Sequence, residues 1–314
     1  MNRLADSEID SLSKRLKKDP GDFECRMSLI KHYWRNRYHS KEDAENHARL
    51  VFWLIENEPD NEVLSDPYCS FRTDGGDYLN RARELFDQAA KANSKKAAVL
   101  VNAGWFYYQM GLPEAEGLLR KCCELESESP TYFLKLGEYY SLSPNGIEDC
   151  ERKSLEAFET AYHLSDDDSG FYQLQSLSQA AFSMGDLKKA AKYAKQLLKG
   201  AESRQEDWNY WNAIHWGNII LGRVSFQKGE VSKAAQHLVT SVKESKGSPQ
   251  LNSFGPDIDL LQELIDLKQF DAGLAYLAEC RKFWSSDRGQ RFMKAATELF
   301  EGQQTADLIE LKCK

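Results

Sequence analysis

The 314-residue sequence has few prolines, no long apolar run and no secretory leader pattern. With only 8 prolines and 41% hydrophobic residues, its composition is that of a folded protein and excludes a disordered one. No stretch approaches the roughly 18 apolar residues of a membrane span. The start, MNRLADSEID, contains no apolar segment of the kind found in signal peptides. These absences predict a cytoplasmic protein with no membrane partner.

The sequence also contains no basic tract longer than a few residues, and its formal net charge is -8. Binding to nucleic acid needs clustered Lys and Arg side chains that neutralise phosphates. We therefore expect no nucleic-acid partner. An acidic surface of this kind mainly promotes solubility.

Motifs that carry chemistry are missing as well. The sequence has no Gly-rich phosphate loop, no HExxH, no nucleophile elbow and no interpretable carboxylate pair, so we expect no catalytic residue and no cofactor. His32, His39 and His47 surround one turn, but no Cys or carboxylate completes a metal-ligand pattern. They are interpreted as surface histidines, with no metal bound. The run 166–168 is all Asp and is interpreted as helix capping, because a calcium loop needs a glycine and alternating ligands.

Cysteine is present in an odd number, seven, without a CxxC pair. Cys122 and Cys280 fall at small-residue positions of amphipathic segments. We expect both to be buried free thiols in a reducing compartment.

A repeated pattern of small and apolar residues is the strongest positive signal. Seven triples have the spacing of one helix face, and their first members lie 33 to 44 residues apart, as in two-helix repeats. The triples are Ala44/Ala48/Val51, Ala82/Phe86/Ala89, Ala115/Leu119/Cys122, Ser154/Phe158/Ala161, Ala190/Ala194/Leu197, Ala234/Leu238/Ser241 and Gly273/Leu277/Cys280.

The residues before several triples resemble the tetratricopeptide repeat. Its signature combines a Leu-Gly pair, a nearby aromatic residue, a turn Gly and an Ala, and the small residues let paired helices approach closely. The matching positions are Leu221-Gly222 with Gly229 and Ala234, Leu177-Ser178 with Gly185 and Ala190, Ala103-Gly104 with Tyr107 and Gly111, and Leu136-Gly137 with Tyr140.

This resemblance implies an all-α, right-handed α-solenoid of helix-turn-helix repeats. We expect about six to seven helix pairs over residues 20–285. A helix within 1–18, with Ile9, Leu12 and Leu16 on one face, is expected to cap the first repeat. Residues 287–314 are expected to cap the other end. The whole chain, 1–314, is predicted to be one domain.

Three segments depart from the repeat pattern. Residues 58–77 contain two prolines and Gly75-Gly76, so they predict a long irregular loop where a helix should precede Ala82. The turn between Tyr140 and Ser154 carries extra residues, including Pro144-Asn145-Gly146. The helix before Leu221 is expected to begin near Asp207 and to extend one to two turns beyond its repeat.

By the resemblance, the first helix of each repeat lines a concave groove that binds a protein or peptide partner. Amide and aromatic side chains dominate this surface, and Arg223 is its obvious anchor for an anion. The predicted groove residues are Trp105, Tyr108, Gln109, Glu138, Tyr172, Gln175, Gln179, Trp216, Arg223, Gln227 and Gln262.

A second candidate site is the segment 247–256, which is bounded by Gly and Pro. It follows one helix pair and precedes the next, so it should lie against the start of the helix around 208–216. Together with Arg281-Lys282-Phe283-Trp284, this region resembles the C-terminal part of a group of uncharacterised bacterial tetratricopeptide proteins, which implies a bacterial origin and does not indicate an activity. The possible pocket comprises Asn212, His215, Asn218, Gln250, Asn252 and Ser253, and a rigid joint with satisfied polar groups is the alternative.

The sequence thus predicts a non-enzymatic scaffold for protein-protein interaction. The alternative is a small-ligand sensor or an enzyme that uses the pocket around His215 and 247–256, although no nucleophile or orienting carboxylate accompanies that histidine in the sequence pattern. The oligomeric state is left open.

Overall fold

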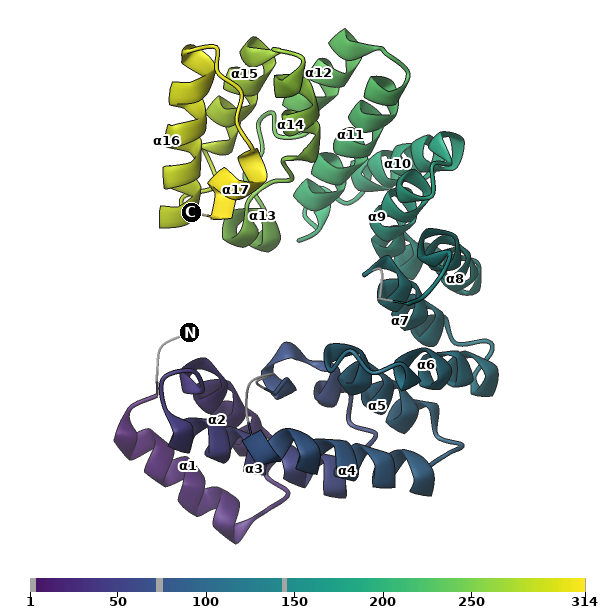
Figure 1. Cartoon of the computed structure of the whole chain (residues 1–314), viewed down its shortest axis with the longest axis vertical. Helices are drawn as coiled ribbons and strands as arrows, with labels where there is room; N and C mark the ends of the chain where they lie inside the picture. The colour runs from purple at the N-terminus through teal and green to yellow at the C-terminus, as the bar shows by residue number, and fades with distance from the viewer. Residues whose placement is uncertain (1–3, 72–75, 143–145, 314) are drawn as a thin grey trace. The chain divides into compact units, whose positions relative to one another are not determined.

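The computed structural model describes residues 4–71, 76–142 and 146–313, and these residues form helices and turns with no strand. They divide into two compact units, 1–148 and 149–314, which run from purple to teal and from teal to yellow in Figure 1. Each unit is an α-solenoid, so the predicted all-α class is confirmed. The prediction of one domain over 1–314 stays a prediction. None of the described helices is long and apolar enough to cross a membrane.

Unit 1 contains two consecutive helical hairpins, α2 with α3 and α5 with α6. Helix α1 packs on α2, and α4 packs between α3 and α5. The elements of unit 1 are α1 (Asp6–Lys18), α2 (Phe23–Asn36), α3 (Lys41–Asn57), the 3-10 helices η1 (Glu62–Ser65) and η2 (Pro67–Cys69), α4 (Gly76–Ala92), α5 (Ala97–Gln109), α6 (Glu114–Leu125) and α7 (Pro130–Ser141).

Unit 2 stacks three hairpins, α9 with α10, α11 with α12, and α14 with α15. Helix α11 also contacts α9 and α14, so these three helices form one layer of the unit. The elements of unit 2 are α8 (Cys150–Leu164), α9 (Asp167–Ser183), α10 (Leu187–Glu202), α11 (Tyr210–Gln227), α12 (Val231–Thr240), α13 (Pro249–Phe254), α14 (Asp259–Asp266), α15 (Phe270–Cys280), α16 (Asp287–Glu301) and α17 (Leu308–Cys313).

The turn between α9 and α10 shows how the sequence sets a hairpin. Gly185 has φ +82°, a left-handed conformation that glycine adopts without steric cost, and it ends the first helix. Asp186 then caps the second helix, because its carboxylate accepts a hydrogen bond from Lys189 N at 2.9 Å. The predicted turn glycines Gly111 and Gly229 also have positive φ.

The small-residue triples are the packing faces of α3, α4, α6, α8, α10, α12 and α15. Every member except the half-buried Ala89 is buried. Cys122 and Cys280 are buried free thiols, as predicted. Burial raises the pKa of the Cys122 thiol to about 12, so the thiol stays neutral at physiological pH.

The segment predicted as an irregular loop at 58–77 takes the place of a first helix. Its described part up to residue 71 contains only the two 3-10 helices. Buried Asn102 of α5 donates to the carbonyls of Pro59 and Asn61, each at 3.0 Å, and accepts from Ser65 Oγ at 2.8 Å. His47 Nε2 contacts the Tyr68 carbonyl at 2.7 Å, which makes the ring the donor. Side chains of neighbouring helices therefore supply the hydrogen bonds that a helix would make internally.

The histidine prediction is corrected by the structure, and the prediction for the Asp run is confirmed. His32 and His47 are buried, at 6% and 2% exposure, so they are not surface histidines; only His39 of the three is exposed. Asp166 caps α9 by accepting from Ser169 N at 2.7 Å, which confirms the capping interpretation. In the described residues, no group of three or more His, Cys, Asp or Glu side chains is arranged to hold a metal ion. Residues 72–75 and Pro144-Asn145 lie outside the described residues.

The predicted caps are helical. Half-buried Leu12 of α1 offers its carbonyl to the thiol of Cys25 at 3.0 Å, which joins this helix to the first hairpin. Helices α16 and α17 close the other end, and Phe300 and Leu308 from them are part of the buried core of unit 2.

Gly222→Leu should destabilise unit 2, because a Cβ at this position of α11 would lie 2.3 Å from Leu260 Cδ2 and 3.1 Å from His237 Cβ. Overpacking of this kind lowers the free energy of unfolding by roughly 1 to 3 kcal/mol. Urea denaturation followed by circular dichroism measures the loss. Gly117→Leu in α6 is the control, because a Cβ there meets no atom within 4 Å. Equal losses in the two variants would contradict the close-packing assignment.

Candidate functional site

A surface hollow of about 470 Å³ in unit 2 is the candidate site. It lies where α9, the start of α11 and the short helix α13 meet. Its walls combine large aromatic rings with uncharged amides and one carboxyl group. The lining residues are Tyr172, Gln175, Trp208, Asn209, Asn212, Trp216, Gln250, Leu251, Phe254, Gly255 and Asp257.

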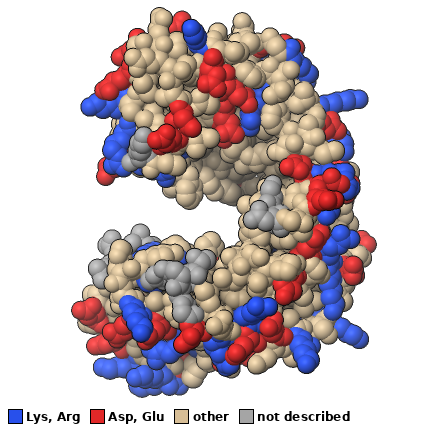
Figure 2. All heavy atoms as spheres, in the orientation of Figure 1, with Lys and Arg blue, Asp and Glu red and all other residues tan. Residues whose placement is uncertain are grey.

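Three of the aromatic side chains around this hollow are strongly exposed. Tyr172 is 42% exposed, Trp208 56% and Phe254 77%. Single exposed apolar residues are ordinary, whereas several around one concavity are typical of an interaction surface. Figure 2 shows acidic side chains gathered over α14, while the surface over α13 is mostly uncharged.

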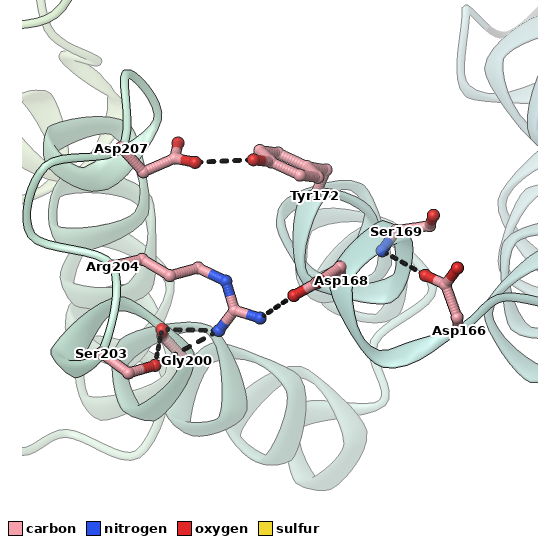
Figure 3. A network of polar contacts seen from close by, with 8 residues as sticks. All are labelled: Asp166, Asp168, Ser169, Tyr172, Gly200, Ser203, Arg204 and Asp207. Carbon is pink, nitrogen blue, oxygen red and sulfur yellow. Dashed lines mark hydrogen bonds and ion pairs between the residues drawn. The ribbon is translucent and has the colours of Figure 1, made fainter.

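A network of polar contacts places the rim residue Tyr172 and the residues just before Trp208 (Figure 3). Arg204, which follows α10, reaches Asp168 of α9 at 2.6 Å and donates to the Gly200 carbonyl at 3.1 Å. The Tyr172 hydroxyl donates to Asp207 Oδ2 at 2.6 Å. These contacts hold the connection between α10 and α11 against α9.

The same connection sets the geometry of two aromatic rings. The rings of Trp208 and Tyr172 are parallel within 6°, with centroids 5.9 Å apart. Aromatic pairs at such separations add stability beyond their buried area. Asp207 does not cap α11 directly, since the helix begins at Tyr210 with Asn209 as its N-cap residue. The expected start near Asp207 is thus three residues too early, but the extension of α11 before His215 is present.

The segment predicted as a loop at 247–256 contains the helix α13. Ser248 caps it by accepting from Leu251 N at 3.0 Å, Pro249 occupies the first turn, and Gly255 ends it with φ +80°. Buried Leu251 anchors the helix in the core, which leaves Phe254 outward. The motif Arg281-Lys282-Phe283-Trp284 explains part of this placement, because the buried ring of Trp284 packs against Gly255.

Direct hydrogen bonds join α13 to α11, as the sequence predicted for these segments. Asn212 Nδ2 donates to Gln250 Oε1 at 3.0 Å, and Ser248 Oγ donates to Asn212 Oδ1 at 2.6 Å. Asn212 is 4% exposed, so its amide organises the floor of the hollow rather than its rim.

His215 lies behind the hollow. It is fully buried, and its Nε2 accepts a hydrogen bond from Asp257 N at 2.9 Å. Nδ1 therefore carries the proton and faces the backbone of Ser241. Burial lowers the pKa of His215 to about 3, which keeps the ring neutral. The Tyr276 hydroxyl donates to the Asp257 carbonyl at 2.6 Å, so the backbone of Asp257 is held on both sides.

Asp257 is the charged group of the hollow. Its Oδ1 accepts from Asp259 N at 3.0 Å. Burial, followed by the nearby carboxylate of Asp259, raises the pKa of Asp257 to about 6. The carboxyl group therefore changes charge close to physiological pH.

The other residues of the predicted pocket lie elsewhere. Asn218 is buried and its Oδ1 pairs with His237 Nδ1 at 3.0 Å. Asn252 and Ser253 are exposed on α13 and do not line the hollow, and Asn252 lies beside Gly247. Only Asn212 and Gln250 of that set line it.

The predicted groove residues divide between the two units. Tyr172, Gln175 and Trp216 line the hollow of unit 2, and Gln179 and Gln227 lie farther along α9 and α11. Trp105, Tyr108, Gln109 and Glu138 belong to unit 1, where Lys135 pairs with Glu138 at 2.8 Å and lies over the Trp105 ring. A common groove formed by both sets stays a prediction.

Arg223 is a correction to the sequence analysis. Its guanidinium forms ion pairs with Glu263 at 2.9 Å and Asp259 at 3.0 Å, and it lies over the ring of Phe182 at 4.5 Å. Two carboxylates of α14 already neutralise the Arg223 guanidinium. Arg223 therefore links α11 to α14 and is not available to bind an anion. Gln262 is also structural, because it donates to the Ala306 carbonyl and accepts from Leu308 N.

Unit 1 has a hollow of its own, about 560 Å³, beside the 3-10 segment. Asp60, Glu62 and Asp66 line it with Lys135 and one aromatic residue, Tyr132. Solvated carboxylates alone do not define a ligand, so the hollow of unit 2, with its exposed aromatic rings, is the stronger candidate.

The sequence analysis missed Trp208, Asn209, Phe254 and Asp257 as members of the site. The aromatic residues of 208–216 and the Gly-Pro boundary of 247–256 were visible signals. The packing of α13 decides that Trp208 and Phe254 are exposed and that Asp257 is half-buried. The spacing of residues in the sequence does not predict this packing.

Comparisons with known proteins do not name a function. No protein-family model matches the chain, and no curated protein matches it. Among solved structures, the crystal structure of MamA is similar, with 19% identity and a TM-score of 0.42, over 53% of this chain and 88% of that chain. A similarity of this extent contributes nothing to the choice of function, which depends on the site itself.

Asn212→Ala and Ser248→Ala should be energetically coupled, because their side chains share one buried hydrogen bond. A double-mutant cycle in denaturant should give a coupling energy of roughly 0.5 to 3 kcal/mol. Pairing Asn212→Ala with Thr240→Ala, on the exposed end of α12, is the control and should be additive within about 0.5 kcal/mol. Additivity in both cycles would argue against the contact between α11 and α13.

Asp257→Asn should change how stability depends on pH. Because the folded pKa of about 6 exceeds the ordinary value of 3.8, the folded state binds more protons between these values, and stability falls as pH rises through that window. The Asn variant keeps an oxygen for Asp259 N and loses the titration. Its free energy of unfolding relative to wild type should therefore rise by on the order of 2 to 3 kcal/mol from pH 4 to pH 7.

Asp257→Ala removes both the titration and the hydrogen bond that Asp257 accepts from Asp259 N, whereas Asp257→Asn removes only the titration. The difference in free energy of unfolding between Asp257→Ala and wild type should change with pH as it does for Asp257→Asn. At pH 4, Asp257→Ala should be less stable than Asp257→Asn. Curves for wild type and Asp257→Asn that run parallel from pH 4 to pH 7 would rule out the raised pKa of Asp257.

Proposed function

We propose that unit 2 binds a peptide segment of a partner protein in the aromatic hollow between α9, α11 and α13, and that the chain acts as a non-enzymatic scaffold. The observation that carries this proposal is the exposure of Tyr172, Trp208 and Phe254 around one concavity. Leaving such rings in water forgoes the free energy of burying them, and a bound segment would recover it.

The hollow is organised in advance for such a partner. The ion pair of Arg204 with Asp168 and the hydrogen bond of Tyr172 to Asp207 hold the rim. Asn212 holds α13 from below. Aromatic anchors that need no reordering bind with little loss of conformational entropy.

The amide groups favour a peptide over a purely apolar ligand. Gln175 and Gln250 are on the lining, and their side-chain NH2 groups donate to no other group among the residues that the structure describes. Amides of this kind hydrogen-bond the backbone of an extended peptide while rings receive its side chains. Gln179 and Gln227 extend the proposed surface along the same two helices.

A small-ligand sensor is the second candidate, because about 470 Å³ falls within the usual volume of small-molecule sites, roughly 300 to 1,000 Å³. His215 gives this alternative no catalytic support, since its Nε2 accepts from the backbone, its Nδ1 faces the backbone, and burial keeps the ring neutral. The strongly exposed outer rings of Trp208 and Phe254 favour the larger partner.

A peptide-display library selected on the immobilised chain tests the proposal. Affinity of the enriched peptides should fall about tenfold or more in Trp208→Ala and in Phe254→Ala, the loss expected for interface hot spots. Leu267→Ala is the matched control, because Leu267 is another exposed apolar residue of unit 2, at 49% exposure, that does not line the hollow. Its affinity should equal that of wild type.

Two other results would overturn the proposal. If the affinity of the enriched peptides is unchanged in Trp208→Ala and falls in Trp105→Ala, the site lies on unit 1. Failure to enrich any peptide, combined with saturable binding of a small molecule that Trp208→Ala removes, would favour the sensor.

A further inference from the structure

The walls of the hollow are electron-rich. Four of its lining residues are aromatic: Tyr172, Trp208, Trp216 and Phe254. The face of each ring carries partial negative charge and attracts a cation within about 6 Å of its centre. Tryptophan attracts a cation more strongly than tyrosine or phenylalanine, and two of the four rings are tryptophans.

The charge of the lining has one sign. Among the described residues that line the hollow, Asp257 is the only charged one, and none is Lys or Arg. One carboxylate oxygen of Asp257 accepts from Asp259 N, and no ion pair of this carboxylate exists among the described residues. A cation entering the hollow would therefore meet aromatic rings together with a carboxylate that has no direct ion-pair partner among the described residues.

Two cations of the chain itself, Arg223 and Lys312, lie over aromatic rings near this hollow. Arg223 lies over the Phe182 ring and pairs with Asp259 and Glu263. Lys312 lies over the Trp284 ring at 5.2 Å and donates to the Pro256 carbonyl at 2.9 Å. Both internal cations are thus held at other rings, and neither lines the hollow.

We propose that the hollow between α9, α11 and α13 receives a lysine or arginine side chain of an extended partner segment, with Asp257 as its counter-ion. The inference rests on the proposed function, because it assigns the chemistry of the peptide bound there. The aliphatic stem packs on the rings of Trp208 and Phe254, and the charged end is directed to the carboxylate. Gln175 and Gln250 hydrogen-bond the backbone on either side.

The test uses the full chain and short peptide pools with one fixed central residue flanked by mixtures of uncharged residues. The central residue is lysine, arginine, glutamate or norleucine, and norleucine has the apolar stem of lysine without its charge. Indole N–H signals of Trp208 and Trp216, identified by Trp208→Phe and Trp216→Phe, report binding at this site.

The lysine and arginine pools should shift both indole signals and bind about tenfold more tightly than the norleucine pool. Asp257→Asn should weaken the lysine pool about tenfold and leave the norleucine pool unchanged. Gln250→Glu adds a carboxylate on the lining and removes one donor to the peptide backbone, so it should raise the preference for the lysine pool over the norleucine pool several-fold. This gain guards against loss of folding as the cause of a lost signal.

The pH dependence gives an independent readout. The titratable or charged groups that face Asp257 are Asp259 of α14, Arg223 and His215 of α11, Lys312 of α17 and Tyr276 of α15. Affinity for the lysine pool should rise from pH 5 to pH 7.5 as Asp257 ionises, and Asp257→Asn should lose most of this rise.

Failure of this inference is distinguishable from failure of the proposed function. Equal affinity of the norleucine and lysine pools, or preference for the glutamate pool, would overturn the cationic occupant and keep peptide binding. If no pool shifts the indole signals of Trp208 or Trp216, both the cation and peptide binding at this hollow are overturned.

Discussion

The close approach of paired helices at small residues is the constraint on which the rest of the structure depends. A methyl group added at Gly222 would collide with Leu260, and one added at Gly217 would collide with Leu198. Interiors pack as densely as organic crystals, so such positions have room for backbone and little else. This spacing brings α10, α11, α12 and α14 together and thereby sets where their ends emerge.

The candidate site is built at those ends. Because α11 begins before its repeat, Asn212 lies in the added turn and bonds α13, while Trp216 one turn later packs on the core. The chain then turns at Gly255 over the ring of Trp284 and passes His215 and Tyr276, which hold the backbone of Asp257. The side chains of Asn212, Ser248 and Gln250 hydrogen-bond one another here, while the aromatic rim faces outward and Asp257 is half-buried.

Buried polar side chains also explain how the array tolerates irregular segments. In unit 1, Asn102 donates to two backbone carbonyls of a segment that has no α-helix, and in unit 2 Asn212 bonds the side chains of Gln250 and Ser248 at the start of α13. A missing helix would otherwise leave backbone groups without partners. One asparagine at each place lets a short insertion pack where a regular helix is interrupted.

The sequence by itself determined the helical class, the packing faces and the places where the repeat breaks, because those depend on local periodicity and on small residues at set spacings. Ala190, Ala194 and Leu197 are buried as their spacing requires. Only the tertiary structure decided which polar residues stay open. Arg223 was read as an open cation, yet Asp259 and Glu263, 36 and 40 residues later, neutralise it. His215 was read as a pocket residue, yet the backbone of Asp257 occupies its ring nitrogen. Pairing across such separations depends on how α14 docks on α11, and no local pattern encodes that docking.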